Sequence, residues 1–251
     1  MIQVKSVKEI PKMVKAGELA AQALKLAGEN AVVGMSTWEL DRIVNDYIVS
    51  KGGHSPCKGY EGFPGHNCFS VNEELIHGIP SKKKILKDGD IISCDIVAEL
   101  NGYMGDNTRT FRVGKVSDET ERLLQATEEA LYKGIAQAVK GNRVGDIGFA
   151  IQSRIESAGY YIVKKYIGHG IGREMHEDPE VPNFGKPGRG PRLIPGMTIA
   201  IEPMVNQTTE ACKILPDRWT VVEGNKKMSA HFEHTVLITE GEPIILTLPT
   251  H

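Results

Sequence analysis

An internal repeat is the feature of this sequence that most restricts its fold. Residues 38–53 and residues 146–160 both carry apolar side chains at the spacing of an amphipathic helix. Each segment closes on a small, helix-ending pair that contains a glycine, Gly52 in one and Gly159 in the other. A single alignment, which we call the repeat register, sets Leu40 on Ile147 and Gly52 on Gly159. A helix that recurs in this way indicates a duplicated unit.

The repeat register also relates two strand-like segments. It brings residues 86–96 onto residues 193–203, and with them Asp95 onto Glu202. In both places a carboxylate stands inside an apolar run, where a buried strand would otherwise be continuous. One register therefore relates a helix, a turn and an acidic strand. We predict two related halves, each made of helices followed by strands.

Composition limits what a chain of this kind can do. The 251 residues are 40% hydrophobic and 25% charged, which is ordinary for a globular protein. A formal net charge of −2 offers no strong field to nucleic acid or to an anionic membrane, so we expect neither partner. The sequence has no apolar run of membrane-spanning length and no signal-peptide core at its start. Its four cysteines lack CxxC spacing, and we expect reduced thiols in a cytoplasmic protein.

Two carboxylates are predicted on one face of a β-hairpin. The Asn-Gly pair at 101–102 lies between strand-like runs and is a strong signal for a two-residue type I′ turn. That turn puts Asp95 opposite Thr108, and Asp106 opposite Val97. The two aspartates then become diagonal neighbours, with Cβ atoms roughly 7 Å apart or less. Uncompensated carboxylates would repel there, whereas a cation between them would satisfy both. A solvated face whose aspartates contact only water is the competing interpretation.

A matching acidic residue is expected in the second half, and Glu233 is the candidate. Asp106 and Glu233 lie farther apart in the chain than Asp95 and Glu202 do, so the second hairpin must be longer, and residues 206–228 provide the extra length. Four carboxylates on facing strands require cations. Oxygen ligands with one imidazole suit Mn²⁺, Fe²⁺, Co²⁺ or Zn²⁺ in a paired site. The imidazole candidate is His169, whose flanking glycines let the backbone turn, although a lone histidine beside glycines is more often a packed turn residue.

Three motifs carry a resemblance to a known family. They are GHGIGREMHE, IEPM and FEHT, preceded by two aspartates with ten residues between them. With these motifs the chain resembles the type I methionine aminopeptidases of bacteria over essentially its whole length. The resemblance implies an α+β pita-bread fold, in which two pseudo-twofold-related halves hold antiparallel sheet inside and helices outside. We expect a single catalytic domain, 1–251, with halves of approximately 1–115 and 116–251.

The resemblance also implies a dinuclear metal site. The five ligands would be Asp95, Asp106, His169, Glu202 and Glu233. Asp106 and Glu233 would bridge two divalent ions, Asp95 would hold the ion that receives the amine of the substrate, and His169 and Glu202 would complete the other site. Cobalt, manganese, iron and zinc all suit these ligands, and the sequence does not choose between them.

The implied activity is that of a metal-dependent peptide hydrolase in protein maturation. It would remove the N-terminal methionine from nascent proteins when the second residue is small, through a hydroxide activated by the dinuclear metal. Glu202 would transfer the proton, His176 would stabilise the oxyanion, and His77 would reach the scissile amide nitrogen. The implied methionine pocket consists of Cys57, Tyr60, Phe63, Cys68, Met175 and Trp219. The partners are the N-termini of nascent polypeptides, with the ribosome as a candidate, and we expect a monomer.

Two positions depart from the pattern of that family. Met175 stands where an aromatic residue is usual, which bears on the shape of the pocket. His231 stands two residues before Glu233, where glutamine is usual, which bears on hydrogen bonding around the ligands. The histidines predicted to be structural or solvent-exposed are His54, His66, His231 and His234.

Three other interpretations share parts of this pattern. Proline-specific aminopeptidases have the same fold and ligands with an added N-terminal domain, whereas this chain starts directly with the catalytic unit. Type II methionine enzymes have a helical insertion, for which the stretch between His176 and Glu202 leaves no room. A non-enzymatic pita-bread protein that binds RNA or protein would have lost ligands. Here all five positions are filled, and the low net charge argues against RNA.

Overall fold

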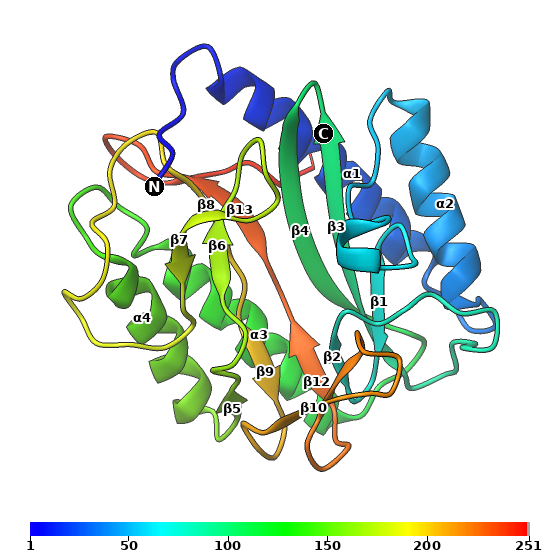
Figure 1. Ribbon diagram of the computed structural model, residues 1–251. Helices are drawn as coiled ribbons and strands as arrows, with labels where there is room; N and C mark the ends of the chain where they lie inside the picture. The colour runs from blue at the N-terminus through cyan, green and yellow to red at the C-terminus, as the bar shows by residue number, and fades with distance from the viewer. Residues whose placement is uncertain (250–251) are drawn as a thin grey trace.

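Helices lie outside and short strands lie inside in the computed structural model, which describes residues 1–249 (Figure 1). Among these residues, no helix combines the length and the apolar character that crossing a membrane requires. The helices are α1 (Ile10–Asn30), α2 (Thr37–Ser50), α3 (Asp118–Ile135) and α4 (Val144–Ser157), with a short 3₁₀ helix over Tyr60–Gly62.

The strands of the two halves pair only in antiparallel fashion within the described part of the chain. The first half contains β1 (Cys68–Val71), β2 (Glu74–Ile76), β3 (Ile91–Leu100) and β4 (Tyr103–Arg112). The second half contains β5 (Tyr161–Ile162), β6 (Gly168–Gly170), β7 (Glu177–Val181), β8 (Thr198–Ile201), β9 (Met204–Asn206), β10 (Cys212–Ile214), β11 (Val221–Glu223), β12 (Ser229–His231), β13 (His234–Leu237) and β14 (Ile244–Ile245). The predicted α+β class is confirmed.

Each half has its own hydrophobic core. In the first half, α1 packs on β3 and β4, α2 packs beside α1, and Val44 and Ile96 are fully buried in the cluster that these elements form. In the second half, α3 and α4 pack on the sheet of β8 and β13, around Leu124, Ile151 and Ile199. Burying one such side chain contributes roughly 1.5–3 kcal/mol to folding. The helices therefore stay on the outer faces, and the inner faces of the sheets remain available for polar side chains.

The repeat register relates the halves element by element. It carries α2 (Thr37–Ser50) onto α4 (Val144–Ser157) with both ends coincident. The glycines after these helices, Gly52 and Gly159, have φ angles of 82° and 81°. Only a residue without a Cβ atom adopts this conformation freely. The pseudo-twofold-related halves of the predicted fold are confirmed.

Local sequence explains where these two helices begin. The hydroxyl of Ser36 accepts a hydrogen bond from the Glu39 N–H, and the Glu39 carboxylate accepts one from the Ser36 N–H. This capping box satisfies two N–H groups that the first turn of α2 leaves unpaired. At the start of α4 the Asp146 carboxylate accepts from the Arg143 N–H in the same way.

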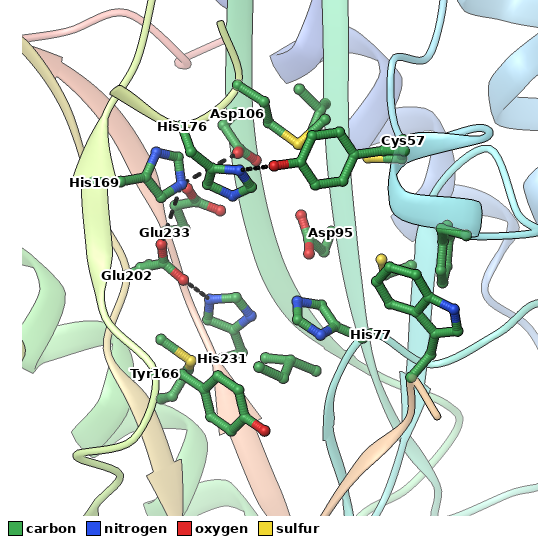
Figure 2. A pocket seen from close by; sticks show the side chains of 18 of the residues that line it. Cys57, His77, Asp95, Asp106, Tyr166, His169, His176, Glu202, His231 and Glu233 are labelled. Carbon is green, nitrogen blue, oxygen red and sulfur yellow. Dashed lines mark hydrogen bonds and ion pairs between the residues drawn. The ribbon is translucent and has the colours of Figure 1, made fainter. Parts of the chain in front are cut away.

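Strands β3 and β4 form the predicted hairpin. Both residues of the turn at 101–102 have positive φ, 56° and 78°, as a type I′ turn requires. Asp95 lies opposite Thr108, and Asp106 lies opposite Val97, so the predicted register is confirmed. Both carboxylates point from one face of the hairpin into the space between the halves, as Figure 2 shows.

The extra length predicted in the second half forms an excursion toward the first half. Between β9 and β12 the chain folds into the β10–β11 hairpin. Strand β11 then pairs with β2 of the first half, where Val221 lies opposite Ile76. The inserted segment therefore connects the two halves along one edge of the space between them.

Candidate metal centre

A cavity of about 290 Å³ lies between the two halves (Figure 2). Every side chain predicted to be a ligand, a catalytic group or part of the methionine pocket lines it. They are Cys57, Tyr60, Phe63, Cys68, His77, Asp95, Asp106, His169, Met175, His176, Glu202, Trp219 and Glu233. The fold thus brings together residues that lie far apart in the chain.

The acidic part of the cavity is built from both halves. Asp95 projects from β3 and Asp106 from β4. Glu202 directly follows β8, Glu233 lies between β12 and β13, and His169 is the middle residue of β6. Because these strands meet at the centre of the molecule, the five side chains converge on one end of the cavity (Figure 2).

The carboxyl groups are buried close together and oppose one another's ionisation. Burial raises the pKa of Asp106 well above its usual range, and the charges of Glu233 and Asp95 raise it further. Burial also raises the pKa of Glu202 and of Glu233 well above normal, again with help from neighbouring carboxylates. Such groups resist losing their protons unless positive charge lies close to them.

Unpaired oxygen atoms indicate where that positive charge would sit. Oδ1 of Asp106 and Oε1 of Glu233 are buried and have no hydrogen-bond partner among residues 1–249. Ligand atoms of Asp106, His169 and Glu233 lie within 4.8 Å of one another. Buried acceptors without donors are unfavourable unless a cation occupies the space between them. The residues present therefore fit a divalent metal.

His169 is oriented as a neutral metal ligand. Its Nδ1 lies 2.9 Å from the carbonyl oxygen of Gly170, to which it donates its proton. Nε2 then keeps a lone pair and faces Glu202 at 3.5 Å and Asp106 at 3.9 Å. Burial lowers the pKa of His169 to about 3, so the ring stays neutral. A fixed tautomer of this kind is usual for ligating histidines.

The two halves hold each other's acidic residues. The Thr108 hydroxyl donates to Oε2 of Glu233 at 2.7 Å, and the Glu233 N–H donates to the Thr108 carbonyl at 2.8 Å. In return, the Thr235 hydroxyl accepts from the Asp106 N–H at 3.0 Å and donates to the Asp106 carbonyl at 2.9 Å. Thr108 follows Asp106 at the same spacing at which Thr235 follows Glu233, so the two threonines occupy corresponding positions in the halves. Their contacts differ, because Thr108 binds the carboxylate of Glu233 whereas Thr235 binds the backbone of Asp106.

Two further histidines can donate hydrogen bonds into the cavity. The Tyr60 hydroxyl lies 3.0 Å from Nδ1 of His176, and a hydroxyl that donates there leaves the Nε2–H of His176 free. The centroids of the His176 and His169 rings lie 4.4 Å apart. Burial lowers the pKa of His176 and lowers that of His77 to about 4, so both rings stay neutral.

The loop that carries Met175 and His176 is attached to the segment before α1, residues 1–9, which we call the N-terminal arm. Lys5 and Glu177 form an ion pair whose side chains are both buried. The other carboxylate oxygen of Glu177 accepts the Arg173 N–H at 2.9 Å. Removing one partner from a buried ion pair typically costs about 3–5 kcal/mol. The arm therefore fixes the loop beside the cavity.

The other end of the cavity is apolar and lined with sulfur. Cys57, Phe63, Cys68 and Met175 are buried in one cluster, and Trp219 packs against it. The rings of Phe63 and Trp219 meet edge to face, with centroids 5.1 Å apart. Burial raises the pKa of both cysteine thiols well above the usual range, so they stay uncharged. Thiols and aromatic rings favour a thioether as their neighbour.

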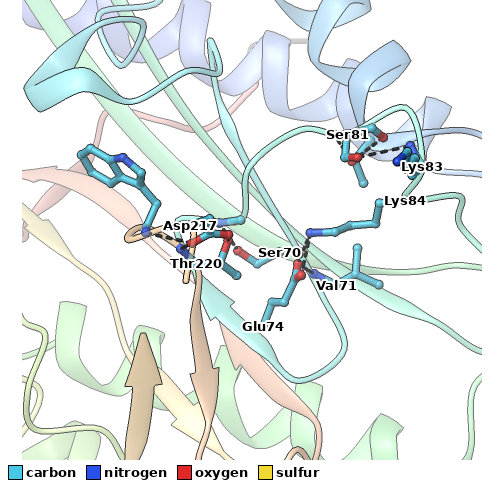
Figure 3. A network of polar contacts seen from close by, with 11 residues as sticks. Ser70, Val71, Glu74, Ser81, Lys83, Lys84, Asp217 and Thr220 are labelled. Carbon is cyan, nitrogen blue, oxygen red and sulfur yellow. Dashed lines mark hydrogen bonds and ion pairs between the residues drawn. The ribbon is translucent and has the colours of Figure 1, made fainter. Parts of the chain in front are cut away.

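Figure 3 shows the polar contacts around Asp217 and Thr220, which hold the backbone of the neighbouring Trp219. The backbone N–H of Trp219 donates to Oδ1 of Asp217 at 2.9 Å, and the Thr220 hydroxyl donates to Oδ2 at 2.7 Å. Although burial opposes it, these hydrogen bonds and the charge of Lys84 lower the pKa of Asp217. Lys84 also pairs with Glu74 at 2.6 Å. The charge of Lys84, in the first half, thus acts on the loop of Asp217 in the second half.

Several residues that line the cavity were not predicted to do so from the sequence. The missed residues are Glu61, Ile76, Val97, Tyr166, Ile167, Met204 and His231. His231, predicted to be structural or solvent-exposed, is only 2% exposed and lines the cavity. Alternation along a strand could have found it, because residues two apart share a face and Glu233 was already a candidate. Of the others, His66 pairs with Asp41 and His54 is exposed.

Comparison with known proteins decides the family. The sequence pattern of metallopeptidase family M24 matches residues 11–240. The chain is 49% identical over 248 residues to the methionine aminopeptidase of Clostridium acetobutylicum, covering 99% of both chains. It is also 49% identical to methionine aminopeptidase 1 of Bacillus subtilis, covering 98% of this chain and 99% of the relative. The chain belongs to the methionine aminopeptidases of family M24.

Solved structures of this methionine aminopeptidase family share the whole fold. The enzyme from Rickettsia prowazekii superimposes with a TM-score of 0.97 at 38% identity, covering 99% of this chain and 100% of that one. The enzyme from Thermotoga maritima gives 0.97 at 42% identity with the same coverage. The prolidase from Pyrococcus furiosus is less similar, with a TM-score of 0.79 at 26% identity over 99% of this chain and 66% of that one. The pita-bread fold and the type I resemblance are confirmed.

Proposed function

We propose that this chain is a metal-dependent aminopeptidase that removes the N-terminal methionine from polypeptides whose second residue is small. The observation that carries the proposal is a single cavity with two unlike ends. Buried carboxylates and an imidazole form one end, and an apolar cluster with three sulfur atoms forms the other. The acidic end suits a cation, and the apolar end suits the side chain of methionine.

We assign two divalent ions to the acidic end. Their ligands would be Asp95, Asp106, His169, Glu202 and Glu233, and Mn²⁺, Fe²⁺, Co²⁺ and Zn²⁺ all suit one imidazole among oxygen ligands. When bound, such a pair of ions acts as a Lewis acid and lowers the pKa of coordinated water. The unpaired oxygens of Asp106 and Glu233 support this assignment.

Three side chains of the cavity are assigned to the proton transfers and charges of hydrolysis. Glu202 would take up the proton of the attacking water and return it to the leaving amine. His176 would donate a hydrogen bond to the peptide oxygen as its negative charge develops. His77 would contact the nitrogen of the scissile amide. Because both imidazoles are neutral, neither repels the ammonium group of a peptide N-terminus.

The size of the cavity supports a preference for small second residues. Its volume of about 290 Å³ is at the lower end of the range of roughly 300–1,000 Å³ found for ligand sites. A cavity of this size restricts which side chains can lie beside the methionine. A β-branched second residue is stiff at χ1 and could not turn away from the walls.

We further infer a cytoplasmic monomer that meets nascent chains, with the ribosome as a candidate partner. All four cysteines are free and three of them are buried, which fits a reducing compartment. Because both halves line that cavity, we regard residues 1–251 as one catalytic domain whose halves meet near residues 115–116.

The test is hydrolysis of Met-Ala-Ser after the protein has been stripped of metal and reloaded with each divalent ion in turn. We expect methionine release to follow bound metal up to two ions per chain. Ala-Ala-Ser is the matched control and should remain intact. Met-Ile-Ser should be cleaved about 10²-fold more slowly, because displacing the reacting centre by about 1 Å costs that much. Protein that binds the ions but releases no methionine would overturn the proposal.

A further inference from the structure

His231 lines the cavity, yet the proposed function gives it no part. The side chain is 2% exposed. Neither of its ring nitrogens has a hydrogen-bond partner among residues 1–249. Burying polar nitrogens without partners is unfavourable, so native proteins keep few of them. An imidazole without hydrogen-bond partners beside an acidic cluster indicates a role in the site when metal is bound.

The carboxylate of Glu202 lies close to this ring. Nε2 of His231 lies 3.4 Å from Oε2 of Glu202, while Nε2 of His169 lies 3.5 Å from Oε1 of the same carboxylate. Figure 2 shows Glu202 with one imidazole on each side. The distance of 3.4 Å is slightly longer than the 2.7–3.2 Å of an N–H···O hydrogen bond, and a small side-chain movement closes it.

The imidazoles of His169 and His231 differ in the nitrogen that can carry a proton. The Nδ1 proton of His169 is committed to the Gly170 carbonyl, so its Nε2 faces Glu202 as a bare nitrogen. His231 has no such commitment, and its proton can reside on Nε2, where Oε2 of Glu202 accepts it. One side of the carboxylate thus meets a lone pair and the other meets a donor.

The backbone of His231 is held by hydrogen bonds on both sides, so the position of its imidazole is fixed. Its N–H donates to the Thr110 hydroxyl at 2.9 Å, and that hydroxyl donates to its carbonyl at 2.9 Å. On the other side it pairs with Met204 of β9. A group held on both sides keeps its geometry, and functional sites depend on such supports.

We propose that His231 is a positioning residue for Glu202. Its Nε2–H donates to Oε2 and keeps Oε1 directed at His169 and the acidic cluster. The inference rests on the proposed function, in which Glu202 is both ligand and proton carrier. Hydrogen bonds to metal ligands typically change metal affinity or activity 10–100-fold, and the effect of His231 should lie in that range.

The experiment compares two substitutions at this position. His231→Leu removes the donor, and we expect kcat on Met-Ala-Ser to fall about 10–100-fold while KM changes less than about twofold. Mn²⁺ affinity, titrated without substrate, should weaken about tenfold, and the visible spectrum of the Co²⁺-loaded protein should change. His231→Gln restores an N–H donor and should recover most of all three. His54→Gln, at an exposed histidine outside the cavity, is the matched control and should match wild type.

Two results would overturn the inference. If His231→Leu keeps the wild-type kcat and Co²⁺ spectrum, Glu202 does not depend on His231. If His231→Gln behaves like the leucine variant while melting like wild type, the imidazole itself is needed and the donor role is wrong. Wild-type protein that releases no methionine contradicts the proposed function alone, because Mn²⁺ affinity and the Co²⁺ spectrum are read without substrate.

Discussion

The two halves of the molecule agree in their scaffold and differ where they carry acidic side chains. In the first half, β3 and β4 are continuous strands of ten residues, and Asp95 and Asp106 project from their interiors. In the second half, Glu202 separates β8 from β9, and Glu233 lies between β12 and β13. Both halves thus provide two carboxylates. In the first half they project from continuous strands, and in the second half they lie where strands are interrupted.

The interruption of the second half follows from its sequence. Pro203 comes directly after Glu202, and proline has no N–H with which to continue a ladder. A glutamate side chain is one methylene longer than an aspartate and can reach the cavity from a backbone that has left the sheet. The two halves thus share their helices and turns, while their acidic residues occupy different backbone settings.

The strongest test of this equivalence is to remove one acidic residue from each half. Asp106→Ala and Glu233→Ala should both lower kcat/KM by about 10³-fold or more, and both should bind less metal, because each removes charge from the reacting centre. Metal per chain after dialysis and methionine release are the measurements. Retention of full metal by either variant would show that its residue is not a ligand and that the halves are not equivalent.

Side-chain length gives the next largest effect. Glu233→Asp retracts the carboxylate by about the length of one C–C bond, and we expect a loss of about 10²-fold in kcat. The reciprocal change, Asp106→Glu, overfills an unbroken strand and should also raise the unfolding rate. Kinetics on Met-Ala-Ser and thermal melts separate the two outcomes. Unimpaired kinetics in Glu233→Asp would remove side-chain length as the reason for glutamate at this position.

A residue that donates a hydrogen bond to the substrate should behave differently from a metal ligand when it is substituted. His176→Ala should keep its metal but lose about 10²-fold in kcat, which is the usual effect of losing one oxyanion donor. The metal content of the purified variant is the control. Loss of metal in proportion to loss of activity would mean that His176 is a ligand instead.

His77 of the first half should make stability depend on pH. The pKa of its imidazole is lowered from 6.5 to about 4 in the folded chain. Between pH 6.5 and pH 4 the unfolded chain therefore binds a proton that the folded chain refuses, and stability is lost as pH falls. Relative to His77→Gln, wild type should lose about 3 kcal/mol over this range, at about 1.4 kcal/mol per unit of pKa difference. Urea titrations of both metal-free proteins measure it, and parallel pH curves would contradict the assignment.

The smallest effect should come from the inserted segment. Asp217→Ala removes the acceptor of the Trp219 N–H and the Thr220 hydroxyl, each bond being worth about 1 kcal/mol. We expect KM to rise several-fold with little change in kcat, because only the wall of the methionine pocket loosens. Asp118→Ala, at the solvent-exposed start of α3, is a suitable control. A fall in kcat without a change in KM would contradict a role confined to the pocket.

The scaffold could be predicted from sequence because its signals are local. An Asn-Gly pair specifies its turn, and the turn specifies which residues of β3 and β4 face each other. The helix ends depend on residues within one turn, such as Ser36 and Glu39 at the start of α2. The repeat register then carries this information into the second half.

Other parts of the cavity depend on contacts between distant segments. Trp219 reaches the methionine pocket only because β11 pairs with β2, and no local pattern predicts that pairing. Only the family resemblance predicts its place in the pocket. Alternation places His231 on the face of Glu233, but its neighbours Glu202 and Thr110 come from distant segments of the chain, which no local pattern relates. The ligand roles and the boundary between the halves stay predictions until the variants above are measured.

The reciprocal contacts of Thr108 with Glu233 and of Thr235 with Asp106 bear on how the molecule moves. A hinge rotation of one half against the other would have to break both contacts at the same moment, and would carry an acidic side chain away with each. The halves should therefore open only together, and amide hydrogens on β4 and β13 should exchange at one common, slow rate. A cavity with such walls keeps its width over time. It would therefore select peptides by whether their side chains fit a fixed space, and not by closing around them.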